Sequence, residues 1–377
     1  MKLSDICELI VDCPHSTAKD EGSGYPLIRT PNIGRGRLIF DDLHRVSKEV
    51  YDKRNARAVP QDDDLILARE APAGNVAIIK NGEKVCLGQR TVLIRPNKNI
   101  VDPDFLVYYI LAPQQQYELL GTANGATVAH VNIPVIKELP VELPSMNIQK
   151  KAASILKNYD DLIDNNLKQI SLLEEAAQRL FKEWFIDFRF PGYEKADTIN
   201  GLPKDWNKKT LAEIVVFQRG KTITKAQVIE GDVPVVAGGL EPAYYHNVAN
   251  TKAPVITVSG SGANAGFSRM YHEDVFASDC SYADIQGTKY ISFVYCFLKA
   301  NKYQLDALQK GSAQPHVYAK DINAMEILIP PVKLIELFCE KTDDIFKNIG
   351  YLQKQSSLAV EARERLLPKL MAEEINL

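Results

Sequence analysis

This sequence lacks paired cysteines. Its six cysteines show no Cys-x-x-Cys spacing, and most lie inside apolar runs such as FVYCFL at residues 293–298. Isolated cysteines of this kind are typical of small buried side chains in a reducing compartment, so we assign them no metal and no nucleophilic chemistry. Structural disulfides are not expected.

Long apolar runs are lacking too. Asp5, Glu8 and Asp12 interrupt the first residues before an apolar stretch of signal length forms, and no run has the length of a bilayer span. With 377 residues, 45% hydrophobic and 25% charged, the chain has the composition of a globular protein of two to three domains. We expect a cytoplasmic protein with no membrane association.

Catalytic motifs are lacking as well. Pro330 and Pro331 stand between Ile and Val, so the Asn/Asp-Pro-Pro-aromatic loop of an adenine methylase is missing. The GKT at 220–222 has Val215 where a phosphate-binding loop needs glycine, and the GSG at 260–262 is not followed by a helical pattern. The six histidines show no metal-ligand spacing. We therefore predict no catalytic residue, no metal site and no cofactor in this chain.

The sequence does contain an internal repeat. Residues 2–6 match 210–214 at an offset of 208, and residues 65–67 match 255–257 at an offset of 190. From residue 144 to residue 180 the offset to the second copy is constant at 186. The order of the matches is kept throughout, which indicates a duplicated two-part unit.

The first part of each unit reads as a head of mixed, mainly β structure. Short runs of β-forming residues are separated by turns in both copies, for example DLILA and RTVLIRP in the first copy and VPVVAGG and APVITVSG in the second. Apolar residues at three-to-four spacing predict a helical segment in DFLVYYILAPQQQYELL and in SFVYCFLKANKYQLDAL.

The second part of each unit reads as one long helix. Residues 146–184 and 332–372 contain no glycine except Gly350 and no proline except Pro368. Each helix would be about 55–60 Å long and has one apolar stripe. The main seam positions are Leu156, Tyr159, Ile163, Asn166, Ile170, Leu173, Ile345, Ile349, Leu352 and Ala359. Asn166 either sets the register of the seam or lies at its edge.

A single helix of this length cannot hide its stripe from water except against another helix, and the other long helix is its own duplicate. We therefore expect an α+β fold in which two similar heads are joined by two long antiparallel helices that form a coiled coil with approximate two-fold symmetry. The expected boundaries are residues 1–144 for the first head, 145–187 for the first helix, 188–330 for the linker and second head, and 331–377 for the second helix.

Two related heads on a helical spacer suit a linear target with two separated recognition elements, such as DNA. The net charge of −3 argues against nonspecific coating of nucleic acid, but basic and polar loops recur at matching places in both copies. The candidate DNA-contacting residues are Arg29, Asn32, Arg35, Arg37, Arg69, Gln89, Arg90 and Asn124 in the first head and Gln218, Arg219, Lys221, Ser261, Asn264, Gln314 and His316 in the second.

Four segments, in order, carry a resemblance to a known family. They are LFKEWFIDF at 180–188, GLPKDW at 201–206, GSAQPH at 311–316 and RLLPKLM at 365–371. Together with the two-copy plan, this set resembles the specificity (S) subunit of type I restriction-modification systems over essentially the whole chain. The first copy departs from GSAQPH, because it has GTANGA at 121–126.

The resemblance implies that each head is a target-recognition domain reading one half of a bipartite double-stranded DNA site. It also implies that the helices set the length of the unread spacer and dock two methyltransferase (M) subunits, with ATP-dependent restriction (R) subunits joining for cleavage. S-adenosylmethionine, ATP and magnesium would then belong to these partners, and this chain would be non-catalytic. From the residues alone, a scaffold that presents two β-rich modules to protein partners remains the alternative.

Overall fold

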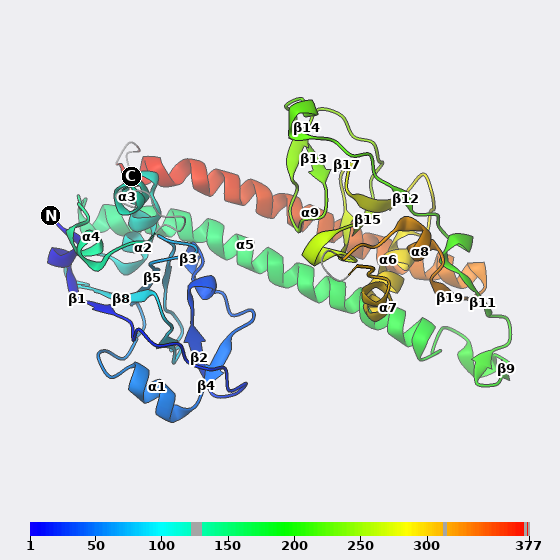
Figure 1. Cartoon of the computed structure of the whole chain (residues 1–377), viewed down its shortest axis with the longest axis horizontal. Helices are drawn as coiled ribbons and strands as arrows, with labels where there is room; N and C mark the ends of the chain where they lie inside the picture. Colours follow the sequence, from blue (N-terminus) through cyan, green and yellow to red (C-terminus); the bar gives the residue numbers. More distant parts are fainter. Residues whose placement is uncertain (122–129, 312–314, 373–374, 376–377) are drawn as a thin grey trace. The chain divides into compact units, whose positions relative to one another are not determined.

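The computed structural model describes residues 1–121, 130–311, 315–372 and 375. The chain divides into two compact units. Unit 1 comprises Met1–Asp164 and Ser357–Leu377, and unit 2 comprises Asn165–Ser356. Each unit thus contains one head together with a part of each long helix, α5 (Met146–Phe181) and α9 (Val332–Met371). Figure 1 labels the elements along the chain.

The head of unit 1 contains two sheets. The larger has the strand order β1 (Cys7–Asp12), β8 (Thr91–Pro96), β5 (Leu65–Ala68), β6 (Val76–Ile78), β3 (Gly36–Arg37), and the smaller has the order β4 (His44–Val46), β2 (Tyr25–Ile28), β7 (Cys86–Leu87). The helices are α1 (Lys48–Arg54), α2 (Pro103–Leu111), α3 (Pro113–Leu120) and α4 (Ile133–Glu138). Short 3-10 turns lie at Leu3–Ile6 and Thr30–Asn32.

The head of unit 2 repeats this arrangement. Its larger sheet has the order β12 (Gln218–Arg219), β18 (Cys280–Asp284), β15 (Val255–Ser259), β16 (Ser268–Tyr271), and a second sheet has the order β14 (Tyr244–His246), β13 (Val233–Val236), β17 (Phe276–Ala277). Two-stranded pairs join β9 (Thr198–Ile199) to β10 (Leu202–Pro203) and β11 (Asn207–Thr210) to β19 (Glu326–Ile329). The helices are α6 (Ile291–Ala300), α7 (Lys302–Ala307) and α8 (Ala319–Asn323), with 3-10 turns at Tyr193–Lys195, Leu211–Glu213, Lys225–Gln227 and Gly262–Asn264.

The strand pairings of the two heads correspond. β2 pairs antiparallel with β4 and parallel with β7, just as β13 pairs antiparallel with β14 and parallel with β17. β5 lies between β8 and β6, as β15 lies between β18 and β16. The predicted duplication of a mixed, mainly β head is therefore confirmed at the level of topology.

Both faces of the larger sheet are buried in each head, which explains the continuous apolar run of β5. Leu65 and Leu67 point into a core shared with α2 and the long helices, whereas Ile66 and Ala68 point into a core beside the smaller sheet. In unit 2, Ile256 faces the helices and Val255 faces the smaller sheet in the same way.

The helical segment predicted for the first head is split in two. Ala112 ends α2 with an extended ψ of 147°, and α3 begins at Pro113. The proline disfavours a helical conformation for the preceding residue, so the chain must turn there. In the second head the corresponding break between α6 and α7 falls at Asn301.

The long helices pair antiparallel within each unit. In unit 1, Asp160 of α5 contacts Arg363 of α9, and Leu156 shares a buried cluster with Leu367. In unit 2, Asn166 donates from Nδ2 to Oε1 of Gln355 at 3.0 Å. Residues with higher numbers on α5 contact residues with lower numbers on α9, so the two helices are antiparallel.

The ten seam residues are buried or half-buried. Leu156, Ile163, Asn166, Ile349 and Ala359 are buried, and Tyr159, Ile170, Leu173, Ile345 and Leu352 are half-buried. Asn166 is 1% exposed, so its side chain lies inside the seam, and its amide donates to Gln355, an exposed residue of the facing helix. α5 continues into a π-helical turn at Lys182–Ile186, and Phe188 has a left-handed φ of 57° where the chain leaves the helix.

Candidate nucleic-acid interface

A polar cluster in the first head lies where β5 ends and β8 begins. We call Arg69, Glu70, Arg90 and His130 the His130 cluster. Nδ1 of His130 lies 2.6 Å from Oε1 of Glu70, and Nη1 of Arg90 lies 2.5 Å from Oε2 of the same carboxylate. β5 and β8 are neighbours in the sheet, so their ends bring Arg69 and Arg90 together. Arg90 remains exposed and can reach a phosphate or a base edge.

The tautomer of a neutral His130 ring follows from its partners. Nη2 of Arg69 lies 2.8 Å from Nε2 of His130, and a guanidinium can only donate. Nε2 therefore accepts, and the proton of a neutral ring sits on Nδ1, which donates to Glu70. This arrangement holds the ring in one orientation at the edge of the loops that follow the sheet.

A corresponding polar cluster lies in the second head. We call Ser261, Asp279, His316 and Tyr318 the His316 cluster. Oγ of Ser261 donates to the carboxylate of Asp279, and the backbone of Ser261 forms a bridge with that of His316. The ring of His316 stacks on Tyr318 with centroids 6.0 Å apart, and Tyr318 is exposed. An exposed aromatic stack beside polar groups can engage a nucleobase.

The two clusters occupy the same place in the repeat. His130 precedes His316 by 186 residues, which is the offset that relates the long helices. His316 was among the residues predicted from the sequence, and His130 was not. Extending the constant offset of 186 backward from residue 144 would have found it.

Two candidate residues are structural rather than exposed. Asn32 is 2% exposed and donates to the carbonyls of Ile39 and Asp41, and Arg69 is 8% exposed and donates to Val131 O at 2.8 Å. Arg69 also pairs with Asp12 at 3.1 Å. Both were expected to contact DNA. Their burial and internal hydrogen bonds instead favour a role in shaping the loops.

Three further candidate arginines of the first head have internal partners but keep exposed surface. Nη2 of Arg29 donates to Asp42 O at 3.0 Å, and Nη2 of Arg35 donates to Leu111 O at 3.3 Å. Arg37 pairs with the Asp164 carboxylate on α5. These three side chains are therefore placed by the fold, and the Arg37–Asp164 pair joins the head to α5.

The other candidates differ in exposure. Gln218, Arg219 and Lys221 are exposed along β12 and the turn after it. Gln89 accepts from Thr17 at 3.0 Å, and Asn264 donates to Gly238 O at 3.4 Å. Asn124 and Gln314 lie outside the described residues. The structure therefore brings Ser261, Asn264 and His316 together around one loop group. Gln218, Arg219 and Lys221 form an exposed polar strip that includes two positive charges.

The place where each head meets the helices differs between the units. In unit 1, Tyr108 donates to Oδ2 of Asp160 at 2.6 Å, and Arg363 pairs with the other oxygen of that carboxylate. Burial, followed by the neighbouring Asp160 charge, raises the pKa of Tyr108. The phenol therefore stays protonated and keeps donating to Asp160.

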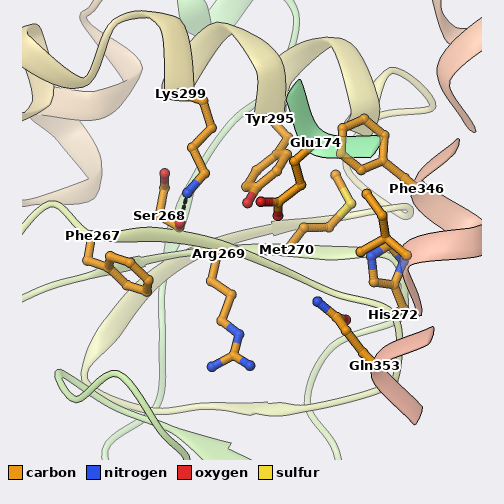
Figure 2. Close-up of a pocket in the computed structure, with 11 residues that line it drawn as sticks. Glu174, Phe267, Ser268, Arg269, Met270, His272, Tyr295, Lys299, Phe346 and Gln353 are labelled. Atoms are coloured by element: carbon orange, nitrogen blue, oxygen red, sulfur yellow. Dashed lines mark hydrogen bonds between the residues drawn. The ribbon is translucent and has the colours of Figure 1, made fainter. Parts of the chain in front are cut away.

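In unit 2 an aromatic contact occupies the same place. Tyr295, the repeat counterpart of Tyr108, packs edge-on against Phe346 with ring centroids 5.6 Å apart. A cavity of about 210 Å³ lies beside this pair, and Figure 2 shows Glu174, Lys299 and His272 around it. Nζ of Lys299 donates to Ser268 O at 3.0 Å. Burial lowers the pKa of Lys299 and lowers that of His272 to about 4.

Five of the six cysteines are buried, and Cys7 is half-buried. Burial raises the pKa of Cys86 to about 11 and that of Cys7 and Cys280 to about 12, so these thiols stay protonated at neutral pH. Across residues 1–121, 130–311, 315–372 and 375, no three His, Cys, Asp or Glu side chains cluster as metal ligands. In the described part of the chain, no helix combines the length and apolar character that crossing a bilayer requires.

Comparison with known proteins agrees with this architecture. The model of the type I restriction modification DNA specificity domain matches residues 1–175 and again residues 203–347. The MjaIX specificity subunit of Methanocaldococcus jannaschii is 27% identical over 412 aligned residues, which cover 99% of this chain and 92% of the relative. The HindI specificity subunit of Haemophilus influenzae is 21% identical, covering 94% of this chain and 95% of the relative.

Among solved structures, the S subunit of a type I restriction-modification system from M. genitalium has a TM-score of 0.60 at 18% identity. The match covers 98% of this chain and 95% of that one, and it shows a shared fold. The fold defines a protein of two repeated recognition-type heads, each packed on a pair of long helices. The chain belongs to the type I restriction-modification DNA specificity family.

Proposed function

We propose that this protein is the non-catalytic, DNA-reading subunit of a type I restriction-modification complex, and that each head reads one half of a bipartite target in double-stranded DNA. The observation that carries the proposal is the recurrence of a polar histidine cluster at the same repeat position in both heads, with Arg90 exposed in one and Tyr318 in the other. Similar but diverged reading surfaces suit two different half-sites.

The long helices would set the number of unread base pairs and dock two methyltransferase subunits. Leu172 and Leu358 support the docking role, because they are repeat counterparts and both are exposed. Equivalent apolar side chains on the two helices suit two copies of one partner. S-adenosylmethionine, ATP and magnesium would be held by these partners and by ATP-dependent restriction subunits, and the complex would act in the cytoplasm.

The DNA-binding part of the proposal is tested with Arg219→Ala in the full chain. Loss of a phosphate contact should weaken binding to duplex DNA and reduce the slope of log K against log salt concentration by about 0.9. Lys208→Ala is the matched control, because Lys208 is an exposed lysine on β11 of the same unit. Fluorescence anisotropy with labelled duplexes measures both. Failure of the wild-type chain to bind any duplex would favour the protein-scaffold alternative.

The docking part is tested by co-purification with the methyltransferase subunit. Leu172→Asp and Leu358→Asp should each remove one of two bound copies, since a charge replaces an apolar contact. Leu167→Asp is the control: Leu167 is exposed on the same helix, but its repeat counterpart is Gln353. Two copies retained by both variants would show that docking lies elsewhere.

A further inference from the structure

A tight turn of the first head places two arginines against the long helices. The backbone N–H of Gly34 donates to Arg37 O at 3.0 Å, and Gly36 has a φ of 97°, which favours glycine. A Cβ atom on Gly36 would lie 3.6 Å from the carboxylate of Asp160, so the turn approaches α5 closely. The side chains of Arg35 and Arg37 leave this turn on either side of the glycine.

Each of these arginines faces a helix carboxylate. Arg37 pairs with Asp164 of α5, and Nη2 of Arg35 lies 3.8 Å from Oε2 of Glu364 on α9. The side chains of Asp164 and Glu364 are 39% and 41% exposed, whereas that of Asp160 is only 15% exposed. Ion pairs as exposed as the first two are worth about 0.2–1 kcal/mol, so another anion can replace the carboxylate at little cost.

The nearby buried Asp160–Arg363 pair keeps the head attached to the helices when Arg35 and Arg37 exchange a carboxylate for another anion. Asp160 keeps Tyr108 and Arg363 as partners whichever anion Arg35 and Arg37 bind. Glu364 also accepts from Nη2 of Arg363 at 2.7 Å, so it retains a partner when Arg35 leaves. The two arginines can therefore change partners while the head stays attached to the helices.

Building on the proposed DNA-binding function, we propose that Asp164 and Glu364 compete with DNA phosphates for Arg37 and Arg35. A guanidinium offers the same donor fork to a carboxylate and to a phosphate. In the free protein the carboxylates neutralise both arginines. On DNA, the phosphodiester backbone replaces them. The competition lowers the affinity for DNA of unrelated sequence, to which the protein binds only through phosphates. On the correct half-site, additional contacts with the bases compensate for this loss of affinity.

The competition is specific to the first head. At the offset of 186, the counterpart of Asp164 is Gly350 and that of Glu364 is Gln178. Neither carries a charge, and the ring of His272 packs over Gly350 in unit 2. The two heads would therefore differ in how strongly they bind DNA of unrelated sequence.

The proposal is tested in the full chain by Asp164→Asn and Glu364→Gln. Their matched controls are Asp161→Asn and Glu361→Gln, which remove the same charge from the same helices but pair with Lys157 and Arg365 instead. Binding to a short duplex of arbitrary sequence is followed by anisotropy from about 50 to 200 mM salt. We expect Asp164→Asn to bind up to about fivefold more tightly than Asp161→Asn, with a salt slope steeper by about 0.9. Glu364→Gln should show a smaller gain, because Nη2 of Arg35 lies 3.8 Å from Oε2 of Glu364, beyond hydrogen-bond distance.

Further variants separate the outcomes. Asp164→Glu, which keeps the carboxylate, should bind like the wild type, and Arg37→Ala should abolish the difference between Asp164→Asn and Asp161→Asn. Equal binding by Asp164→Asn and Asp161→Asn, while Arg37→Ala still weakens binding, would overturn the competition but leave the proposed DNA binding intact. No binding by the wild-type chain would overturn the proposed function itself.

Discussion

The two units join head to helices by different chemistry at the same repeat positions. In unit 1, Tyr108, Asp160 and Arg363 form a nearly buried polar group. In unit 2, their counterparts at an offset of 186 or 187 are Tyr295, Phe346 and Ala177. There, aromatic packing takes the place of the ion pair.

The difference shows that the fold requires a buried contact at this point and not a particular interaction. A polar group works in unit 1 because every member has a partner, so that no buried charge is left unpaired. An aromatic group works in unit 2 because the rings of Tyr295 and Phe346 bury apolar area against each other. The stabilities of the two units should therefore respond differently to side-chain truncation and to pH.

The largest effect is expected from truncating the aromatic core of unit 2, to which both Phe346 of the head–helix contact and Phe338 belong. Phe338 of α9 is fully buried, and its ring lies 5.1 Å from Phe185 and 5.9 Å from Phe181. Phe338→Ala should therefore destabilise unit 2 by about 3–5 kcal/mol. Both tryptophans of the chain, Trp184 and Trp206, lie in unit 2, so urea unfolding followed by tryptophan fluorescence reports on that unit. A shift below about 1 kcal/mol would contradict the packing described.

A smaller effect is expected from opening the polar contact of unit 1. Asp160→Ala leaves Arg363 nearly buried without its main partner and should cost about 2–3 kcal/mol. Unit 1 has no tryptophan, so hydrogen exchange of peptides from α2 is the suitable measurement. Asp161→Ala removes a neighbouring exposed carboxylate and should change protection by less than about 0.5 kcal/mol. Equal effects of the two variants would argue against a special role for Asp160.

The smallest expected effect is a pH dependence confined to unit 2. The pKa of His272 is lowered to about 4 by burial, from 6.5 in the unfolded chain. The unfolded state therefore binds more protons between these values, so the stabilisation is complete above pH 6.5 and is lost as pH falls toward 4. At pH 5 the loss should be about 2 kcal/mol. His272→Gln should reduce the change in the tryptophan-detected stability of unit 2 between pH 7 and pH 5. An unchanged pH dependence in this variant would show that His272 is not its source.

Much of the fold could be predicted from pattern. Apolar runs such as DLILA became buried strands, and the two glycine-poor segments became α5 and α9. Strands of mixed polarity were harder to recognise: CSYAD in β18 is central to its sheet, yet it contains the polar residues Ser281 and Asp284. Its burial depends on neighbours that are distant in sequence.

The candidate site could be predicted only in part. An asparagine or arginine in a turn looks the same in sequence whether it faces solvent or an internal carbonyl. Asn32 and Arg69 turned out to bond the backbone of their own head, whereas Arg90 and Arg219 are exposed. No local pattern distinguishes these cases, because the deciding partners come from other segments of the chain.

The sequence alone determined that the chain is a duplicated head and helix, because hydrophobic period and repeat offset are properties of residue order. Only the tertiary structure decided which charges neutralise each other. Arg37 meets Asp164, and Asp160 meets Arg363, across long separations in sequence. Ion pairing depends on distance in space, and that distance exists only once the sheets and helices have packed.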